Sequence, residues 1–271
     1  MTDDYDITVS VASDIGCQRT NNEDAARSVL PGDPEVRGRK GVLVVVADGM
    51  GGHSAGEVAS RLAVDVVHRT YYDDGNAAGP TLADAVLRAN EAIYEMAQRD
   101  RALAGMGTTC TALLIRGSEA ECAHVGDTRL YLVRQDQIYR MTEDHSEVRS
   151  LVAQGLLSIE EAQHHAERNV ILRALGTHPT VDVSTWSEPF PVRAGDRFVL
   201  SSDGLHDVVE DEEIKALALG EQGQAACDAM VELAKSRGGR DNITVALVNV
   251  QPAGSSGAGS ARETRTVQVQ P

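Results

Sequence analysis

The sequence predicts an α+β fold in which antiparallel strands and groups of helices form layers. Short segments rich in β-branched residues recur along the chain, and polar or glycine-containing turns bound many of them. Between residues 109 and 141 successive strands are separated by only a few residues, which is too short for a parallel crossover. We therefore expect an antiparallel meander there and not a doubly wound parallel sheet.

Eight segments have the composition of strands. They are residues 7–13, 42–47, 109–115, 119–125, 129–134, 181–186, 197–201 and 243–250. The turn after the third consists of Arg116, Gly117 and Ser118, and the turn after the fourth of Gly126, Asp127 and Thr128.

Three longer blocks have apolar residues at the spacing of one helical face. The positions are Val58, Leu62 and Val66 in the first block, Leu82, Val86, Ala89, Ile93 and Met96 in the second, and Ala226, Met230 and Leu233 in the third. Because these helices are grouped between runs of antiparallel strands, they favour a layered α+β domain.

We expect one folded domain over residues 1–251. Within it, residues 142–178 are polar and helix-prone, which fits either an ordinary helical connection or a mobile flap over a site. From Pro252 the composition turns to glycine, serine and alanine, so residues 252–271 are predicted to be a flexible tail or linker.

The charge excludes several classes of partner. The chain has 25 basic and 41 acidic residues and a net charge of −16, which repels nucleic acid and anionic membranes. Its acidic N-terminus lacks the apolar region of a signal peptide, and no apolar run is long enough for a membrane segment. Four scattered cysteines form no zinc or disulfide pattern. We therefore expect a cytoplasmic protein.

Aspartates stand where predicted strands begin or end. Asp48 and Asp203 follow strands, Asp241 precedes one, and Asp127 lies in a turn between two. In an antiparallel arrangement these positions can share one rim, where the carboxylates would raise one another's pKa unless cations lay between them. Oxygen ligands alone select Mg²⁺, Mn²⁺ or Ca²⁺. Each Asp-Gly pair taken singly is also a common turn.

The glycine-rich segment DGMGGHSAGE, residues 48–57, does not fit a nucleotide-binding loop. Ser54 occupies the third glycine position of GxGxxG, and no Gly-Lys-Ser/Thr follows. A covalent phosphate acceptor of the haloacid dehalogenase kind would have Asp-x-Asp, whereas Met50 stands at that second aspartate. We interpret the glycines as allowing close approach of the backbone to a ligand or metal.

An ordered set of motifs resembles the PPM (type 2C) protein phosphatases, in particular their bacterial branch. The motifs extend from about residue 7 to residue 250. They are Arg19-x-x-x-Glu23-Asp24, Asp48-Gly49-Met50-Gly51-Gly52-His53, Gly107-Thr108-Thr109, Gly126-Asp127-Thr128-Arg129, Ser202-Asp203-Gly204-Leu205-x-Asp207 and Asp241-Asn242. The resemblance implies a four-layer α-β-β-α sandwich with two antiparallel central sheets flanked by helices.

The resemblance also implies a centre of two Mn²⁺ or Mg²⁺ ions, with a weaker third site. Matched motif positions give the roles that follow. Asp48 would bridge the two ions, the Gly49 carbonyl would bind one of them, and Asp203 and Asp241 would hold the other. Glu23 would act through metal-bound water, with Asp24 in support. Asp127 and Asp207 with Asp203 would form the third site, and Arg19 would bind the substrate phosphate. A hydroxide bridging the ions would then attack phosphoserine or phosphothreonine.

One position departs from the animal and plant members of this family. They carry a histidine directly after the Asp-Gly, proposed as the acid for the leaving group, whereas this chain has Met50. His53 lies nearby but does not match that position, and we expect His145, at the start of the candidate flap, to be structural.

The resemblance further suggests partners and alternatives. Phosphorylated proteins, among them Ser/Thr kinases and their substrates, would be the partners of a monomeric enzyme. The alternatives are a catalytically weak relative that acts as a regulatory binding module, and a phosphatase of anti-sigma antagonist proteins. Thr264 and Thr266, in the arginine-containing tail, are candidate kinase targets.

Overall fold

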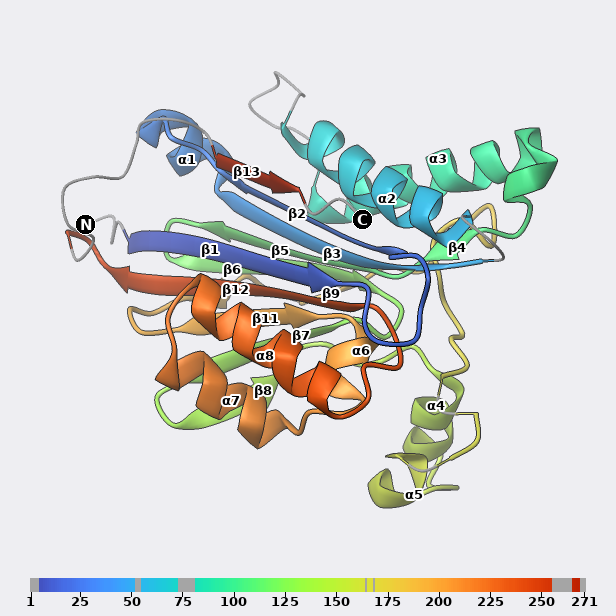
Figure 1. Ribbon diagram of the computed structural model, residues 1–271. Helices are drawn as coiled ribbons and strands as arrows, with labels where there is room; N and C mark the ends of the chain where they lie inside the picture. The colour runs from blue at the N-terminus through green and yellow to red at the C-terminus, as the bar shows by residue number, and fades with distance from the viewer. Residues whose placement is uncertain are drawn as a thin grey trace.

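Two antiparallel sheets lie face to face between two layers of helices in the computed structural model (Figure 1). The structure describes residues 5–51, 55–72, 81–163, 165–167, 169–254 and 265–268. A mainly aliphatic core lies between the sheets, and a further core joins each sheet to its helices. The predicted four-layer α+β sandwich is confirmed.

The first sheet places the two ends of the domain side by side. Its strand order is β1 (Tyr5–Asp14), β12 (Ile243–Pro252), β11 (Arg197–Ser201), β7 (Arg129–Arg134) and β8 (Gln137–Arg140). Along β12, Val245 and Leu247 face the helices, whereas Ala246 and Val248 face the other sheet. Both faces are therefore buried, which explains why this strand is apolar throughout.

The second sheet has the strand order β10 (Phe190–Pro191), β6 (Glu119–Val125), β5 (Cys110–Arg116), β3 (Val42–Met50), β2 (Asp24–Leu30) and β13 (Arg265–Gln268). Two short strands lie beside this order, since β4 (Gly107–Thr108) pairs with β3 and β9 (Ser184–Thr185) pairs with β6. Strand β2 was not predicted. The predicted strand 181–186 is reduced to the two residues of β9.

Two pairs of helices cover the outer faces of the sheets. Helices α2 (Ala55–Tyr72) and α3 (Leu82–Arg99) pack on the second sheet, and α7 (Asp211–Gly220) and α8 (Gln224–Ser236) pack on the first (Figure 1). The predicted face of α3 is buried except at Met96, which is 37% exposed. The shorter elements are α1 (Pro34–Lys40), the 3₁₀ turn η1 (Arg101–Leu103) and α6 (Asp203–His206).

The predicted meander over residues 109–141 is wrong at its centre. Strands β5 and β6 pair in one sheet and β7 and β8 pair in the other, but β6 and β7 do not pair with each other. The turn Gly126–Thr128 is too short for a parallel crossover, yet it can carry the chain from one sheet to the next. Asp127 therefore lies between the two sheets and not at a hairpin tip.

The candidate flap contains α4 (Glu147–Ala153) and α5 (Ile159–Gln163), which project from the sandwich (Figure 1). An isolated bridge joins Ser146 to Ile171 at its base, and another joins Leu175 to Thr108.

Most of the predicted tail, including Thr264, lies outside the described residues. Within the tail, Pro252 is the last residue of β12, and Arg265–Gln268 pairs with β2 as a strand. No helix in the described ranges is long and apolar enough to cross a membrane.

Candidate metal centre

Asp48 and Asp24 face each other across neighbouring strands. They are paired in the register of β3 and β2. The backbone of Asp48 is fixed by β4 and the residue after it: its carbonyl accepts hydrogen bonds from the Thr108 hydroxyl and the Thr109 N–H, both at 2.8 Å. Its own N–H donates to the Thr109 hydroxyl at 2.9 Å. The Gly-Thr-Thr motif therefore holds Asp48 without using its carboxylate.

Glu23 approaches the same strand because two glycines make room for it. A Cβ at Gly49 would lie 2.1 Å from the Gly56 carbonyl oxygen, and one at Gly56 would lie 2.9 Å from the Glu23 carboxylate. The Gly49 N–H donates to the Glu23 carbonyl at 3.1 Å. Here the glycines bring backbone and carboxylate together, as their composition suggested.

Asp203 and Asp241 lie at adjacent ends of β11 and β12. Asp203 is the first residue of α6, and a Cβ at Gly204 would lie 2.0 Å from the Asn242 carbonyl oxygen. The side chain of Asn242 accepts from the Glu23 N–H at 2.7 Å and donates to the Asn21 carbonyl at 2.9 Å. Asn242 thus fixes the loop that precedes β2 against the Asp241 turn.

The carboxylates are close enough to shift one another's pKa. Burial, followed by the charges of Asp24, Asp203, Asp127 and Asp241, raises the pKa of Asp48 well above its usual range. Burial and then Asp127, Asp241, Asp207 and Asp24 do the same for the pKa of Asp203. Burial is also the main cause that raises the pKa of Asp24 to about 6 and that of Asp127 to about 7. The structure therefore brings the predicted aspartates to one place.

Several of these acids have buried oxygens without a hydrogen-bond partner. They are Glu23 Oε1, Asp24 Oδ1 and Asp203 Oδ1. Unpaired buried acceptors are costly, and a hard cation is the ligand that carboxylate oxygens bind best. In the part of the chain that the structure describes, no three His, Cys, Asp or Glu side chains already stand around a common ion position. The donor set fits divalent cations, but its side chains would have to rotate to hold them.

Arg19, which was predicted to bind the substrate phosphate, forms an ion pair with Asp241 in this structure. Its Nη2 is 2.6 Å from Asp241 Oδ2, and this hydrogen bond is the main cause that raises the pKa of Arg19. Glu23 and Asp48 contribute to the same field. Because 48% of the Arg19 side chain is exposed, the guanidinium can leave Asp241 at little cost.

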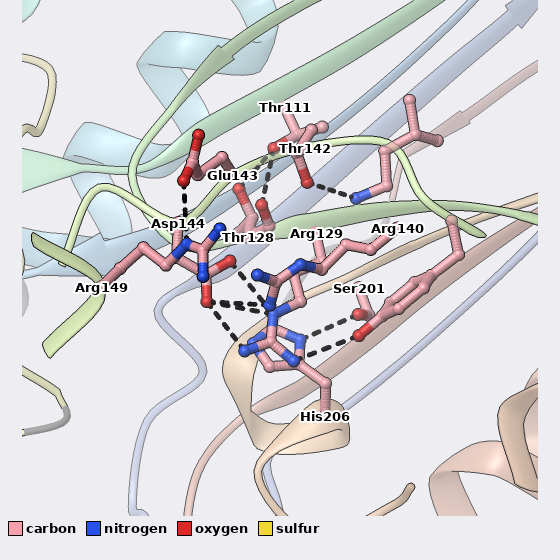
Figure 2. A network of polar contacts seen from close by, with 12 residues as sticks. Thr111, Thr128, Arg129, Arg140, Thr142, Glu143, Asp144, Arg149, Ser201 and His206 are labelled. Carbon is pink, nitrogen blue, oxygen red and sulfur yellow. Dashed lines mark hydrogen bonds and ion pairs between the residues drawn. The ribbon is translucent and has the colours of Figure 1, made fainter. Parts of the chain in front are cut away.

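A cavity of about 610 Å³ opens beside Asp127, Asp203 and Asp207, between the candidate flap and the α6–α7 segment. A polar network follows its wall (Figure 2). In it, Asp144 accepts hydrogen bonds from Arg129 Nη2 at 2.8 Å and from Arg140 Nη1 at 3.4 Å. Arg129 belongs to one of the sequence motifs, but the motif predicted no role for it. Its spacing from Asp144 in the sequence did not indicate this contact either.

Two histidines lie next to this network, His124 buried and His145 partly buried. The ring centroids of His124 and His145 are 4.8 Å apart, and burial is the main cause that lowers the pKa of each to about 4. Met50, in β3, has no ionisable group, and His53 lies outside the described residues.

The fold and the carboxylate cluster define a metal-dependent phosphatase architecture, and sequence comparison agrees. The family model described as Protein phosphatase 2C matches residues 18–244. The chain belongs to this family, whose members depend on divalent metal ions.

Particular relatives are bacterial. The chain is 42% identical to "Serine/threonine protein phosphatase PstP" of Mycobacterium tuberculosis over 242 residues, which are 88% of this chain and 44% of that protein. It is 34% identical to "Protein phosphatase PhpP" of Streptococcus pneumoniae, over 89% of this chain and 97% of that one. A solved catalytic domain of PstP with two manganese ions matches with a TM-score of 0.75 and 36% identity, over 90% of this chain and 98% of that chain. The chain thus spans less than half the length of the mycobacterial relative.

Proposed function

We propose that this chain hydrolyses phosphoserine and phosphothreonine in proteins with the help of Mn²⁺ or Mg²⁺. The observation that carries this proposal is the set of buried carboxylates that raise one another's pKa and include oxygens without a partner. Ionised carboxylates packed this closely repel one another, and bound cations would neutralise that repulsion. The names of the bacterial relatives support a protein substrate.

Two core ions and a weaker third would be held by different subsets of the cluster. Asp48 with the Gly49 carbonyl and Glu23 would serve one side, and Asp203 with Asp241 the other. Asp127 and Asp207, next to Asp203, would form the third site, and Asp24 would support Glu23. When bound, the ions would activate water and neutralise the phosphoryl oxygens.

The chain's own residues position the acids and the substrate. Thr108 and Thr109 hold Asp48, and Ser202 donates to Asp24 Oδ2 at 2.7 Å, so one hydroxyl ties the two sheets together at the site. Arg19 would release Asp241 and donate to the substrate phosphate in the bidentate manner of a guanidinium. This exchange brings a permanent positive charge to the dianion in a protein whose net charge is −16.

The substrates would be phosphorylated proteins, including Ser/Thr kinases and the proteins that these kinases modify, and the enzyme would act as a cytoplasmic monomer. A regulatory module without activity is disfavoured because every matched carboxylate is present. No feature of the site favours anti-sigma antagonists over other phosphoproteins.

The test is hydrolysis of p-nitrophenyl phosphate and of a phosphothreonine peptide, with Mn²⁺ and with chelator. We expect Asp203→Ala and Asp241→Ala each to lower kcat by at least about a hundredfold, the scale of one lost electrostatic contact to the transition state. Asp182→Ala is the matched control, since Asp182 is an exposed acid in the loop before β9. Activity that persists in chelator, or in both cluster variants, would contradict the proposal.

A further inference from the structure

Three consecutive residues at the start of the candidate flap contact the turn that carries Asp127 or the strands on either side of it. The Glu143 carbonyl accepts from His124 Nε2 at 3.1 Å. The Asp144 carboxylate accepts from Arg129 Nε and Nη2 (Figure 2). The His145 N–H donates to the Gly126 carbonyl at 2.7 Å. The base of the flap is therefore attached to both sides of Asp127.

The side chain of His145 makes a second contact with the same turn. The Gly126 N–H donates to His145 Nδ1 at 3.1 Å. Since a backbone N–H can only donate, Nδ1 must carry the lone pair, and the ring proton lies on Nε2. That nitrogen donates to the Ser184 hydroxyl at 2.9 Å. Only the neutral ring in this tautomer makes both hydrogen bonds.

Thr109 holds the turn from the other side. Gly126 has a φ of +109°, and a Cβ there would lie 2.5 Å from Thr109 Cβ. Thr109 is also the residue whose hydroxyl and N–H fix the backbone of Asp48. The Gly126–Asp127 turn is thus enclosed between Thr109, which fixes the backbone of Asp48, and His145, which belongs to the flap.

His145 is also joined to the returning segment of the flap. The Leu172 N–H donates to the His145 carbonyl at 2.7 Å, one residue from the bridge between Ser146 and Ile171. His145 therefore lies in the outgoing segment of the flap and contacts both the returning segment and the Asp127 turn.

We propose that His145 is a positioning residue whose Nδ1 holds the Gly126–Asp127 turn, so that the flap base and the third metal site are coupled. This inference rests on the proposed function, because it gives Asp127 a metal-binding role. Loss of the Nδ1 contact frees the Gly126 amide, which would loosen the turn and weaken cation binding at Asp127. It would leave the core ions, held by Asp48, Asp203 and Asp241, in place.

Two near-isosteric variants separate this role from general packing. The amide oxygen of His145→Asn lies close to the position of Nδ1 and can still accept from Gly126, whereas that of His145→Gln lies close to Nε2 and can reach only Ser184. His145→Ala keeps neither contact. The measurements are hydrogen exchange of the Gly126 amide in metal-free protein, and Mn²⁺ binding by calorimetry and electron paramagnetic resonance.

We expect His145→Gln and His145→Ala to lose protection of the Gly126 amide and to weaken the weakest class of Mn²⁺ sites about fivefold to tenfold, the worth of one hydrogen bond. The Mn²⁺ affinity of this weakest class of sites in His145→Asn should stay within about twofold of the wild type. The Mn²⁺ affinity of the tighter sites should be unchanged in all three variants. If His145→Ala does not fold, the comparison of Asn with Gln decides.

Equal exchange and equal Mn²⁺ affinity in the Asn and Gln variants would overturn the role of His145. If the wild type bound no Mn²⁺, the proposed function would fail with it. If the wild type bound Mn²⁺ and the Asn and Gln variants did not differ, only this inference would fail.

Discussion

Replacing Asp203 by asparagine should stabilise the protein in chelator while abolishing hydrolysis. Asp203 Oδ1 is buried without a partner, and burial, followed by the charges of Asp127, Asp241 and Asp207, raises the pKa of this carboxyl. Asparagine keeps nearly the same shape but carries no charge. The substitution therefore removes repulsion without opening a cavity.

The size of the effect has an upper bound. A carboxyl that is too costly to ionise takes up a proton instead, so its penalty cannot exceed the cost of protonation. Each pH unit above the ordinary pKa of 3.8 corresponds to about 1.4 kcal/mol, which gives at most about 4 kcal/mol at pH 7. Asparagine keeps an Oδ1 acceptor, so the substitution removes the cost of the charge and not that of an unpaired acceptor. We expect a gain in unfolding free energy between zero and that bound.

The gain should depend on pH with a definite sign. Because the folded pKa of Asp203 is raised, the folded protein keeps a proton that the unfolded chain loses above pH 3.8. The penalty therefore starts near that pH and grows as the pH rises. At pH 5 the bound is only about 1.6 kcal/mol.

The assay is thermal unfolding in chelator at pH 5 and pH 7, with and without added Mn²⁺. A gain of 1 kcal/mol should raise the Tm by about 2–4 °C in a chain of this size. Mn²⁺ should raise the Tm of the wild type more than that of Asp203→Asn, since only the wild type keeps the full donor set. Asp182→Asn is the control. If Asp203→Asn melted at or below the wild type in chelator at pH 7, the reasoning would be refuted.

Three further predictions follow from single contacts. Arg19→Ala should raise KM for a phosphopeptide about tenfold or more, and the KM of Arg19→Lys should lie between those of the wild type and Arg19→Ala. The Mn²⁺ affinity measured by calorimetry should not fall, because the substitution releases the Asp241 carboxylate. Weaker Mn²⁺ binding would contradict this. Asp144→Asn should lower the free energy of unfolding measured in urea by about 3 kcal/mol, because the largely buried Arg129 loses its charged partner. A loss below about 1 kcal/mol, the level of a surface ion pair, would show that water replaces the carboxylate. His124 has its pKa lowered from 6.5 to about 4, so the unfolded chain binds the proton first and stability falls with pH below 6.5. Between pH 6.5 and pH 5 this group should remove about 2 kcal/mol from the wild type and nothing from His124→Gln.

The positions of Asp48, Asp203 and Asp241 were predictable because each stands at the end of a strongly apolar strand. Strand ends are visible in a sequence, and antiparallel pairing places neighbouring ends on one edge. In the structure the β11–β12 pair brings Asp203 and Asp241 together in this way. The burial of β3 between the sheet partners β2 and β5 then sets Asp48 beside them.

The structural positions of Asp24 and Asp127 could not be predicted from the sequence. Strand β2 reads DAARSVL, with one β-branched residue, and its first five positions lack the alternation of a half-buried strand. Its neighbours β3 and β13 determine its conformation. The Gly126–Thr128 turn looked like a hairpin because the number of connecting residues does not distinguish a turn within one sheet from a step between two. Only the packing of the sheets does.

The contacts that place the acids are made by uncharged neighbours. Thr108 and Thr109 hold Asp48, and Asn242 holds the loop before Asp24. Hydrogen bonds of this kind do not weaken when a carboxylate is neutralised. The backbone positions of these acids are therefore held by contacts that do not depend on the charge of the carboxylates. It follows that Asp-to-Asn changes alter the electrostatics of the centre while its backbone stays in place.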